Sequence, residues 1–257
     1  MPPPGGLSDG QTRRTDVFMR LSGLKGLEAV ELGRRDAERS EGDRSGSARV
    51  FLKDRAYREL KDLILGEVFP PGTFLSERQL TARLDMSKTP IRSALERLES
   101  EGFVTVSPQQ GIVVRELSVH EIVDLFDVRI ALETFVARRL SGRLVPEQMA
   151  QVRENLGAQA ACVEVGDAVR CTVLDANFHL MLCEFLDNRE IVQAMRELRD
   201  KLYRVALRVS RQAVGRLQAS TEEHRGIAEA VIEGEGERAA ARVEAHLEYG
   251  KRFLVSR

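Results

Sequence analysis

The strongest constraint on the fold is a pair of short amphipathic helices predicted on either side of a tight turn. Ser76-Glu-Arg-Gln79 has the form of a capping box, with a hydroxyl N-cap and glutamine at N3, and predicts a helix that ends at Leu84. The turn is Asp85-Met86, since aspartate tolerates left-handed backbone. Ser87 caps the next helix, which ends at Gly102. The apolar face of that helix consists of Ile91, Ala94, Leu95 and Leu98.

The segments before and after this helix pair are predicted to form a further helix and a β-hairpin. Phe51–Gly66 has a helical apolar period and predicts a first helix. After the pair, two β-branched runs, Phe103–Val106 and Ile112–Val114, flank Ser107-Pro-Gln-Gln-Gly111 and predict a β-hairpin. Three helices and a small β-hairpin over residues 50–117 are typical of a winged helix-turn-helix, in which the second helix of the pair enters the major groove of DNA.

The chain after Ser118 has helical periodicity to its end, with breaks at glycine, asparagine or aspartate residues. The predicted helices are Val119–Leu140, Pro146–Val165, Asp167–Leu186, Arg189–Arg211, Leu217–Glu233 and Glu235–Phe253. They predict a second domain, residues 118–257, that is an all-α bundle of six to seven helices. The fold class is therefore mainly α, with the winged helix-turn-helix first.

The first 49 residues differ in composition from the rest. They contain glycine, proline and charged residues of both signs, with only short apolar pieces such as Leu27–Leu32. Such a segment buries too little apolar surface to offset its ordering entropy. We therefore expect residues 1–49 to be a disordered N-terminal extension, and their pattern indicates no function.

Composition excludes several classes of protein. The chain has 39 basic and 40 acidic residues, so its net charge of −1 gives no global attraction to nucleic acid. A long apolar run and a basic-then-apolar start are both absent from the sequence, which argues against a membrane span and a secretory signal. The three cysteines, Cys162, Cys171 and Cys183, are odd in number and lack metal-like spacing. They argue against a disulfide framework and predict a reducing, cytoplasmic location.

A cationic turn begins the second helix of the predicted helix-turn-helix. Lys88 and Arg92 lie four residues apart on one face, next to Ser87 and Thr89, as donors that reach one groove should. Arg78, in the first turn of the preceding helix, is placed to reach phosphates or a base. The alternative is a solvated charged face, since the domain has as many acidic as basic side chains. The acids of this helix, however, lie at its far end, which favours DNA binding.

Residues 76–104, SERQLTARLDMSKTPIRSALERLESEGFV, closely resemble the DNA-binding domain of GntR-family bacterial transcription regulators. The resemblance implies DNA contacts by Arg78, Lys88, Thr89 and Arg92, near the N-cap Ser87, and places Gly111 at the tip of the wing. It also implies a homodimer on palindromic double-stranded DNA. Lys88 stands where the family usually has arginine, and so lacks the bidentate fork for guanine. Gln109 and Gln110 precede the wing glycine where a basic residue is common.

Three of the four histidines are predicted to face the core of the helical domain. His179 shares a helix face with Asp175, four residues earlier, while His224 and His246 each lie on the apolar stripe of a later helix. Buried polar groups are costly to leave unpaired, and joint ligation of a cation would satisfy all four residues. The alternative is three separate, hydrogen-bonded core histidines. His120, at the domain junction, is expected on an exposed turn.

The helical domain resembles the FCD effector domain of GntR regulators. The motifs that carry this resemblance are Asp175-Ala-Asn-Phe-His179, Glu223-His-Arg225 and Ala245-His-Leu247, in that order. Members with these residues bind a divalent cation in the bundle core. By implication Asp175, His179, His224 and His246 are metal ligands here, with positions left open for water or an effector carboxylate. Zinc, nickel and manganese are all compatible with this ligand set.

Arg129 falls on the apolar stripe of the first helix after Ser118, and an inward arginine needs an anion. One interpretation is an intrahelical pair with Glu133, four residues later. The other, which the resemblance implies, is a clamp on the carboxylate of an effector bound at the metal. Arg199 and Arg204 are weaker candidates, more typical of a solvated or dimer face.

Together these features predict a cytoplasmic, homodimeric, DNA-binding transcription regulator controlled by a small organic acid at a metal-containing pocket. Repression is the commoner mode in the family. The competing class is an enzyme, a metal hydrolase or lyase that uses the Asp/His site, but the sequence lacks an obvious general base, nucleophile motif or glycine-rich phosphate loop. A regulator with a metal-free anion pocket is a third interpretation.

Overall fold

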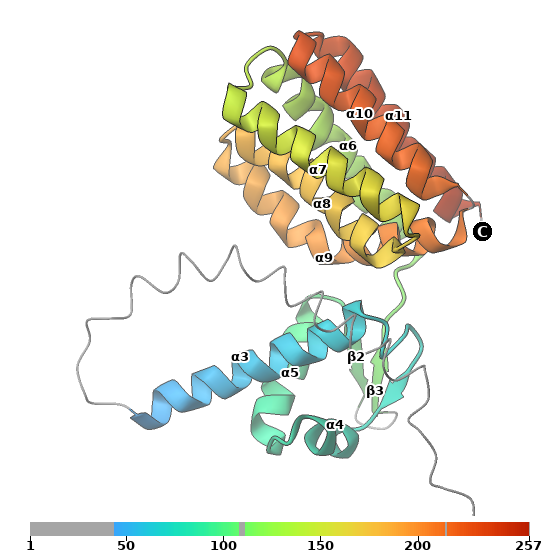
Figure 1. The fold of residues 1–257 in the computed structure, drawn as a ribbon. Coiled ribbons are helices and arrows are strands. Elements are labelled where there is room, and N and C mark those ends of the chain that lie inside the picture. Colours follow the sequence, from blue (N-terminus) through green and yellow to red (C-terminus); the bar gives the residue numbers. More distant parts are fainter. Residues whose placement is uncertain (1–43, 108–110, 214, 257) are drawn as a thin grey trace, which may run out of the picture. The chain divides into compact units, whose positions relative to one another are not determined.

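The computed structural model describes residues 44–107, 111–213 and 215–256, and these are mainly helical with one small sheet (Figure 1). The chain forms two compact units, with the division between Glu116 and Leu117. The first is a winged helix-turn-helix and the second is a helical bundle, which confirms the predicted fold class. None of the described helices is long and apolar enough to cross a lipid bilayer.

The helices of the first unit are α3 (Arg44–Leu65), α4 (Glu77–Leu84) and α5 (Lys88–Ser100). α3 begins before the expected Phe51 and so extends into the segment 1–49, of which residues 1–43 lie outside the described part of the chain. α4 starts with the predicted capping box, in which the side chains of Ser76 and Gln79 each accept a backbone hydrogen bond from the other. Asp85 has the expected left-handed backbone, with φ 51°.

The core of the first unit combines its helices with the wing. Its most buried members are Ala56, Leu60, Ile64, Leu80, Leu84, Ile91, Ala94, Leu95, Leu98, Phe103, Val104, Ile112 and Val114. The predicted apolar face of α5 is buried throughout. α5 is therefore held by one face, and the polar residues of its first turns are left at the surface.

The wing is an antiparallel sheet in the order β1-β3-β2. Its strands are β1 (Phe74–Leu75), β2 (Val104–Ser107) and β3 (Gly111–Val114). The β2–β3 hairpin was predicted, whereas β1 is too short to show an alternating pattern. Gly111, with φ 83°, begins β3 opposite Ser107. The residues between these two, including Gln109 and Gln110, lie outside the described residues.

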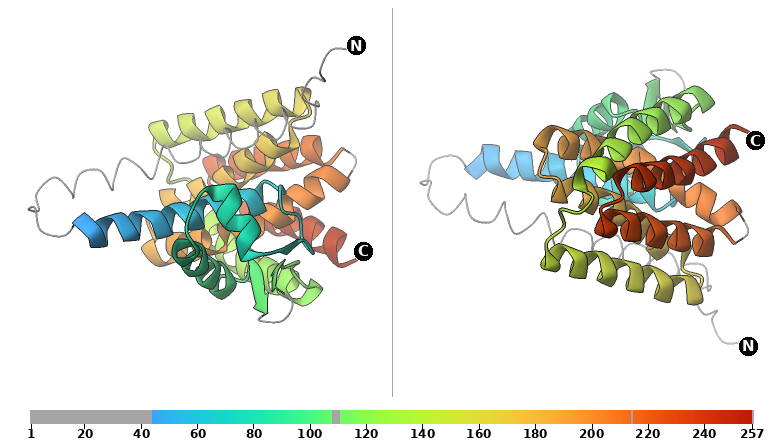
Figure 2. Two further views of the ribbon diagram at one scale, coloured as in Figure 1. Left: turned by 90° about the horizontal axis from the view of Figure 1, so that it is seen from below. Right: turned by 90° about the horizontal axis from the view of Figure 1, so that it is seen from above.

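The second unit is a bundle that Figure 2 shows from two further sides. Its helices are α6 (Val119–Leu140), α7 (Pro146–Glu164), α8 (Ala168–Phe185), α9 (Arg189–Gln212), α10 (Arg216–Glu233) and α11 (Gly236–Val255). The predicted bounds agree with these to within two residues at every end. The agreement follows from glycines with positive φ between the helices, among them Gly142, Gly166, Gly215 and Gly234, because such backbone cannot continue a helix.

Polar side chains are buried in the middle of this bundle. The surrounding core is apolar and includes Phe178, which is fully buried. The buried polar residues include Glu133, Gln159, His179, His224 and His246. These come from α6, α7, α8, α10 and α11, so five different helices meet at one polar centre. The candidate site lies there.

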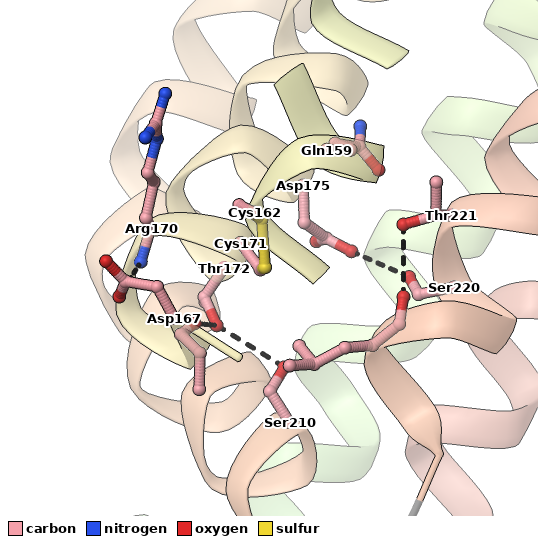
Figure 3. Close-up of a disulfide and its surroundings, with 12 residues drawn as sticks. Gln159, Cys162, Asp167, Arg170, Cys171, Thr172, Asp175, Ser210, Ser220 and Thr221 are labelled. Atoms are coloured by element: carbon pink, nitrogen blue, oxygen red, sulfur yellow. Dashed lines mark hydrogen bonds between the residues drawn. A yellow bond between two sulfur atoms is a disulfide. The ribbon is translucent and has the colours of Figure 1, made fainter. Parts of the chain in front are cut away.

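A disulfide joins Cys162 of α7 to Cys171 of α8 (Figure 3). The cysteine pattern argued against a disulfide framework, and this bond is at odds with that expectation, while Cys183 is free and buried. The chain turns back at Gly166, and this brings two residues that are nine apart in sequence to a Cα–Cα distance of 5.8 Å. The number and spacing of the cysteines could not predict this pair, because the two come together only through the chain reversal at Gly166.

Two glycines meet where the loop after α6 crosses the turn before α11. A Cβ added to Gly142 would lie 3.3 Å from the Cα of Gly234. The Gly142 amide also donates a hydrogen bond of 2.8 Å to the carbonyl of Val231. We expect Gly234→Ala to lower the free energy of unfolding by about 1–2 kcal/mol, because Gly234 has φ 82° and an L side chain is strained there.

Gly157→Ala is the matched control. Gly157 is exposed within α7, and no atom lies within 4 Å of an added Cβ. Because alanine is the better helix former, this change should raise the free energy of unfolding by up to about 1 kcal/mol. Urea unfolding followed by circular dichroism measures both variants. Equal effects of the two substitutions would contradict the backbone conformation assigned to Gly234.

Candidate metal centre and nucleic-acid interface

The residues predicted to contact DNA are all at the surface of the helix-turn-helix. Ser87 is the N-cap of α5, and its side chain makes no capping hydrogen bond. Lys88, Thr89 and Arg92 follow in the first turns of α5, and Arg78 lies in the first turn of α4. All five residues are exposed. The fold thus packs none of them into the interior and keeps the start of α5 open to a ligand.

Arg92 is oriented by a carboxylate that the sequence pattern did not reveal. Its Nε and one terminal nitrogen donate to the two carboxylate oxygens of Glu77 in α4, over 2.8 and 3.0 Å. The hydrogen bond from Arg92 lowers the pKa of the Glu77 carboxyl. The Arg92 side chain stays 61% exposed. The pair therefore joins the starts of α4 and α5 and fixes the guanidinium at the surface without burying it.

In the helical unit, each of the three core histidines has an oxygen atom at its Nδ1. Glu133 Oε2 lies 2.5 Å from Nδ1 of His179, and Gln159 Oε1 lies 2.8 Å from Nδ1 of His224. The third distance, from Glu223 Oε2 to Nδ1 of His246, is 2.6 Å. Carboxylate and amide oxygens accept hydrogen bonds, so each Nδ1 carries a hydrogen. When the hydrogen is on Nδ1, the Nε2 atom of a neutral imidazole presents a lone pair.

The Gln159 amide is itself oriented by a second hydrogen bond. Its Nε2 donates to Oδ1 of Asn155 over 2.6 Å, and Nδ2 of Asn155 donates to the carbonyl of Leu174 over 3.2 Å. With its nitrogen used in this way, Gln159 can present only its oxygen to His224. The ring orientation of His224 is thus fixed through α7 and α8 together.

The three Nε2 atoms converge on one point. Nε2 of His224 lies 3.2 Å from Nε2 of His179 and 3.3 Å from Nε2 of His246. Asp175 completes the group, with Oδ1 3.5 Å from Nε2 of His224. One ligand atom from each of the four residues lies within 4.8 Å of the others. Lone pairs at these separations repel unless a cation lies between them, so the donor set fits a metal ion.

Burial keeps two of these rings neutral. Desolvation lowers the pKa of His179 and of His224 well below 6.5, because the interior penalises the charged imidazolium. Burial alone would raise the pKa of the Glu223 carboxyl, but the hydrogen bond from His246 and the pair with Arg216 lower it to about 2. A neutral imidazole beside an ionised carboxylate is the form of histidine that binds metals.

Arg129 is buried and makes the intrahelical pair that was one of its two interpretations. Its Nε donates to Oε1 of Glu133, whose other oxygen contacts His179. The terminal nitrogens of Arg129 have no hydrogen-bond partner among the described residues. Glu133 therefore connects the arginine to a candidate metal ligand, and the arginine retains donors for an anion.

A pocket opens beside this centre. Its polar wall contains Arg129, Asp175, His179, Arg199 and Tyr203, and its apolar wall contains Ala176, Leu180, Met195, Leu202 and Ala206. The cavity itself has a volume of about 20 Å³, and the empty space with its opening to solvent is about 370 Å³. The buried hydroxyl of Tyr203 has no hydrogen-bond partner in the described part of the chain, and burial raises its pKa to about 12. Tyr203 therefore stays protonated and can donate a hydrogen bond.

Several residues of this site were missed by sequence reasoning. Glu133 was considered only as a partner of Arg129, and Gln159 and Glu223 were given no role. Arg216 is also buried and donates two hydrogen bonds, of 2.8 and 2.6 Å, to Glu223. A polar residue on the inner face of a predicted helix was the available signal. It does not say which histidine on another helix the residue meets.

Two family models match this chain: "Bacterial regulatory proteins, gntR family" over residues 52–114, and "FCD domain" over residues 124–249. The Nta operon transcriptional regulator of Aminobacter aminovorans is 31% identical over 70% of this chain and 83% of its own length. The HTH-type transcriptional repressor RspR of Escherichia coli strain K12 is 31% identical over 53% of this chain and 60% of its own length.

Solved structures share the fold. The crystal structure of a transcriptional regulator GntR from Rhodococcus sp. RHA1 has a TM-score of 0.68 at 23% identity, and the match covers 79% of this chain and 97% of that one. Escherichia coli McbR/YncC has a TM-score of 0.66 at 21% identity, over 80% and 97% of the two chains. The families and named relatives are transcription regulators, not enzymes.

The buried histidines should make stability depend on pH. His179 and His224 stay neutral in the fold because their pKa values lie well below 6.5, whereas the unfolded chain takes up protons below about pH 6.5. Their contribution is therefore complete above that pH and is lost as the pH falls. For the metal-free protein we expect the free energy of unfolding to fall by up to about 1.4 kcal/mol per pH unit for each histidine.

Urea unfolding in EDTA between about pH 5.5 and 7.5 measures this slope. His120→Gln is the control, because the His120 side chain is 88% exposed and lies outside the histidine centre. A His224→Asn variant should show a shallower slope. An identical slope in wild type and His224→Asn would contradict the neutral, buried state assigned to His224.

Proposed function

Because this chain belongs to the GntR family of bacterial regulatory proteins and carries its FCD domain, we propose that it is a repressor whose operator binding is controlled by a small organic acid bound beside a divalent metal ion. DNA-binding transcription regulation follows from the family. The acid, the metal and the repressor mode are the proposal. The convergence of three histidine Nε2 atoms next to a pocket is the observation that supports it most directly.

Asp175, His179, His224 and His246 would hold the metal. FCD domains are known to bind metal, and these four residues supply three nitrogens and one oxygen. Such a set suits zinc, nickel or manganese and leaves coordination positions open. When bound, the ion would act as a Lewis acid that attracts a carboxylate. The protein itself would fix the tautomers of the three histidines through Glu133, Gln159 and Glu223. It would also provide the pocket next to the open coordination positions of the metal.

The pocket favours an acid with an apolar body. Five apolar side chains line it, and Arg199 in its wall has no ion-pair or hydrogen-bond partner among the described residues. Arg199 and the terminal nitrogens of Arg129 would bind carboxylate oxygens, since guanidinium pairs with carboxylate in a bidentate manner. The Tyr203 hydroxyl would donate to a further oxygen of the ligand. An amphipathic carboxylate fits these walls better than a polyhydroxylated acid, whose hydroxyl groups would lose water without replacement.

Two copies of the DNA-binding surface, one from each subunit of a homodimer, would bind one operator. A homodimer would place the start of α5 of each subunit in successive major grooves of a palindromic operator. Lys88, Thr89 and Arg92 would then meet base edges, while Arg78 and the free amides at the helix starts would bind phosphates. The relative RspR is named a repressor, which supports the same mode here. Effector binding can shift operator affinity only as far as it prefers one arrangement of the dimer.

Arg92→Ala should weaken operator binding by about 1–3 kcal/mol if Arg92 reads a base. The operator is first selected from random duplexes with the purified full chain, and fluorescence anisotropy then gives the affinity. Arg97→Ala is the matched control, because Arg97 is exposed near the far end of α5 and pairs with Glu101. Unchanged affinity for Arg92→Ala, or an equal loss for Arg97→Ala, would remove the assigned role.

A metal-dependent thermal shift tests the pocket. At one hundred times its Kd, an effector should stabilise the metal-loaded protein by about 2.7 kcal/mol, a rise in Tm of roughly 5–10 °C. Straight-chain aliphatic acids of increasing length should act more strongly than gluconate. The rise should disappear after treatment with a chelator, and Arg199→Gln should reduce it.

Arg196→Gln is the control for the arginine variant. Arg196 is exposed on the same helix, donates to Glu184 over 2.8 Å and does not line this pocket. If no acid raises the Tm, the effector pocket is wrong. If an acid raises it equally with and without chelator, the metal-free anion pocket is correct and the metal is not required.

A further inference from the structure

The disulfide between Cys162 and Cys171 lies close to the histidine centre. Both cysteines are buried, Cys162 completely and Cys171 to 6% exposure. We propose that this pair is a thiol–disulfide exchange site, and that its oxidation state sets the metal affinity of the Asp/His centre. The inference goes beyond the regulator function above, and its metal readout rests on the proposed metal site.

The two cysteines stand one helical turn from residues of the centre. Cys171 precedes Asp175 by four residues on α8, the helix that also carries His179. Cys162 follows Gln159 by three residues on α7, and Gln159 contacts Nδ1 of His224. Figure 3 shows Asp175 between the Cys162–Cys171 bond and Ser220, whose hydroxyl donates to it. The covalent bond therefore ties together the two helices that supply a ligand and a ligand's partner.

A side-chain hydrogen bond also joins these two helices near the centre. The Asn155 side chain donates to the Leu174 carbonyl over 3.2 Å. Asp175 is held from α10 by the Ser220 hydroxyl over 3.1 Å. Reduction removes this covalent link, so the end of α7 and the start of α8 are then free to shift relative to each other. A displacement near 1 Å is enough to loosen a preorganised site.

The exchange requires a dithiol as reductant. One of its thiolates attacks the Cys171 sulfur, the more accessible of the pair. The S–S bond breaks, a mixed disulfide forms, and Cys162 leaves as a thiolate that takes a proton. The second thiol of the reductant, as thiolate, then attacks the reductant's first sulfur in the mixed disulfide. This breaks the bond to Cys171, which leaves as a thiolate and takes a proton. Two electrons and two protons pass to the protein, and the dithiol becomes a cyclic disulfide.

Thiol–disulfide exchange matters for a protein whose target is DNA. A protein that binds chromosomal DNA works in the compartment where thiol systems keep cysteines reduced, and disulfides there are mostly transient or redox-sensing. A peroxide would restore the bond, since two thiols and hydrogen peroxide give one disulfide and two waters. Cys183 is a separate case: it is buried and unpaired, and burial strongly raises the pKa of its thiol. It should take no part.

The experiment compares two forms of the wild-type full chain. One is reduced with dithiothreitol, which is then removed under nitrogen, and the other is oxidised with peroxide. Mass spectrometry after alkylation should find Cys162 linked to Cys171 only in the oxidised form. Isothermal titration with Mn²⁺, which binds thiolates poorly, should give a Kd about tenfold lower for the oxidised form, the size of effect that supporting residues of metal sites have.

The linkage can also be measured in the opposite direction. If the oxidised form binds Mn²⁺ tenfold more tightly, saturating Mn²⁺ must make the disulfide harder to reduce. The midpoint potential in a dithiothreitol redox buffer should then become about 30 mV more negative, which is tenfold for a two-electron couple. A Cys162→Ser/Cys171→Ser double variant should bind Mn²⁺ like the reduced form after either treatment. Cys183→Ser should keep the full response.

Each failure has its own meaning. If peroxide does not link Cys162 to Cys171, the exchange site is wrong and the proposed metal function is untouched. If the bond forms reversibly but the two forms bind Mn²⁺ with equal Kd, the coupling is wrong. If neither form binds Mn²⁺, nickel or zinc, the metal site of the proposed function is wrong, and the coupling to it is wrong as well.

Discussion

Three imidazole Nε2 atoms converge at the centre of the second unit, where Nε2 of His224 lies 3.2 Å from that of His179 and 3.3 Å from that of His246. Each ring turns its lone pair inward because its other nitrogen uses a hydrogen on an oxygen of Glu133, Gln159 or Glu223. Such an arrangement is unfavourable without a positive charge at its centre, and the apolar core around it cannot supply one. Five helices converge on this point, so the positions of the histidines and their hydrogen-bond partners depend on how the bundle packs.

The outer partners of the histidines extend the centre toward the pocket. Arg129, Glu133 and His179 form a continuous series in which one carboxylate contacts both a guanidinium and an imidazole. An anion that binds Arg129 would weaken the ion pair between Arg129 and Glu133, and Glu133 would then interact more strongly with His179. Ligand binding and metal binding would therefore be coupled through a single side chain, and reciprocity requires that each strengthen or weaken the other by the same factor.

Local patterns were sufficient for some of this structure. The bounds of α6 to α11 could be predicted because helical periodicity and left-handed glycines are both short-range, and Asp175 and His179 could be paired because four residues make one turn. Glu133 and Gln159 could not be assigned, since each meets a histidine on another helix and their spacing along the chain carries no information. The Glu77–Arg92 pair and the Cys162–Cys171 bond were missed for the same reason: both depend on how a turn folds back.

The carboxylate of Glu77 has a consequence for how the protein searches DNA. Arg92 already has two hydrogen bonds to Glu77, so exchanging them for a phosphate gains little, while the displaced carboxylate then faces a polyanion. A guanine edge, whose O6 and N7 accept both hydrogen bonds and carry no full negative charge, would replace the Glu77 carboxylate without this repulsion. With Arg92 on DNA as proposed, the negative Glu77 side chain beside it would lower the affinity for random sequence more than the affinity for the operator.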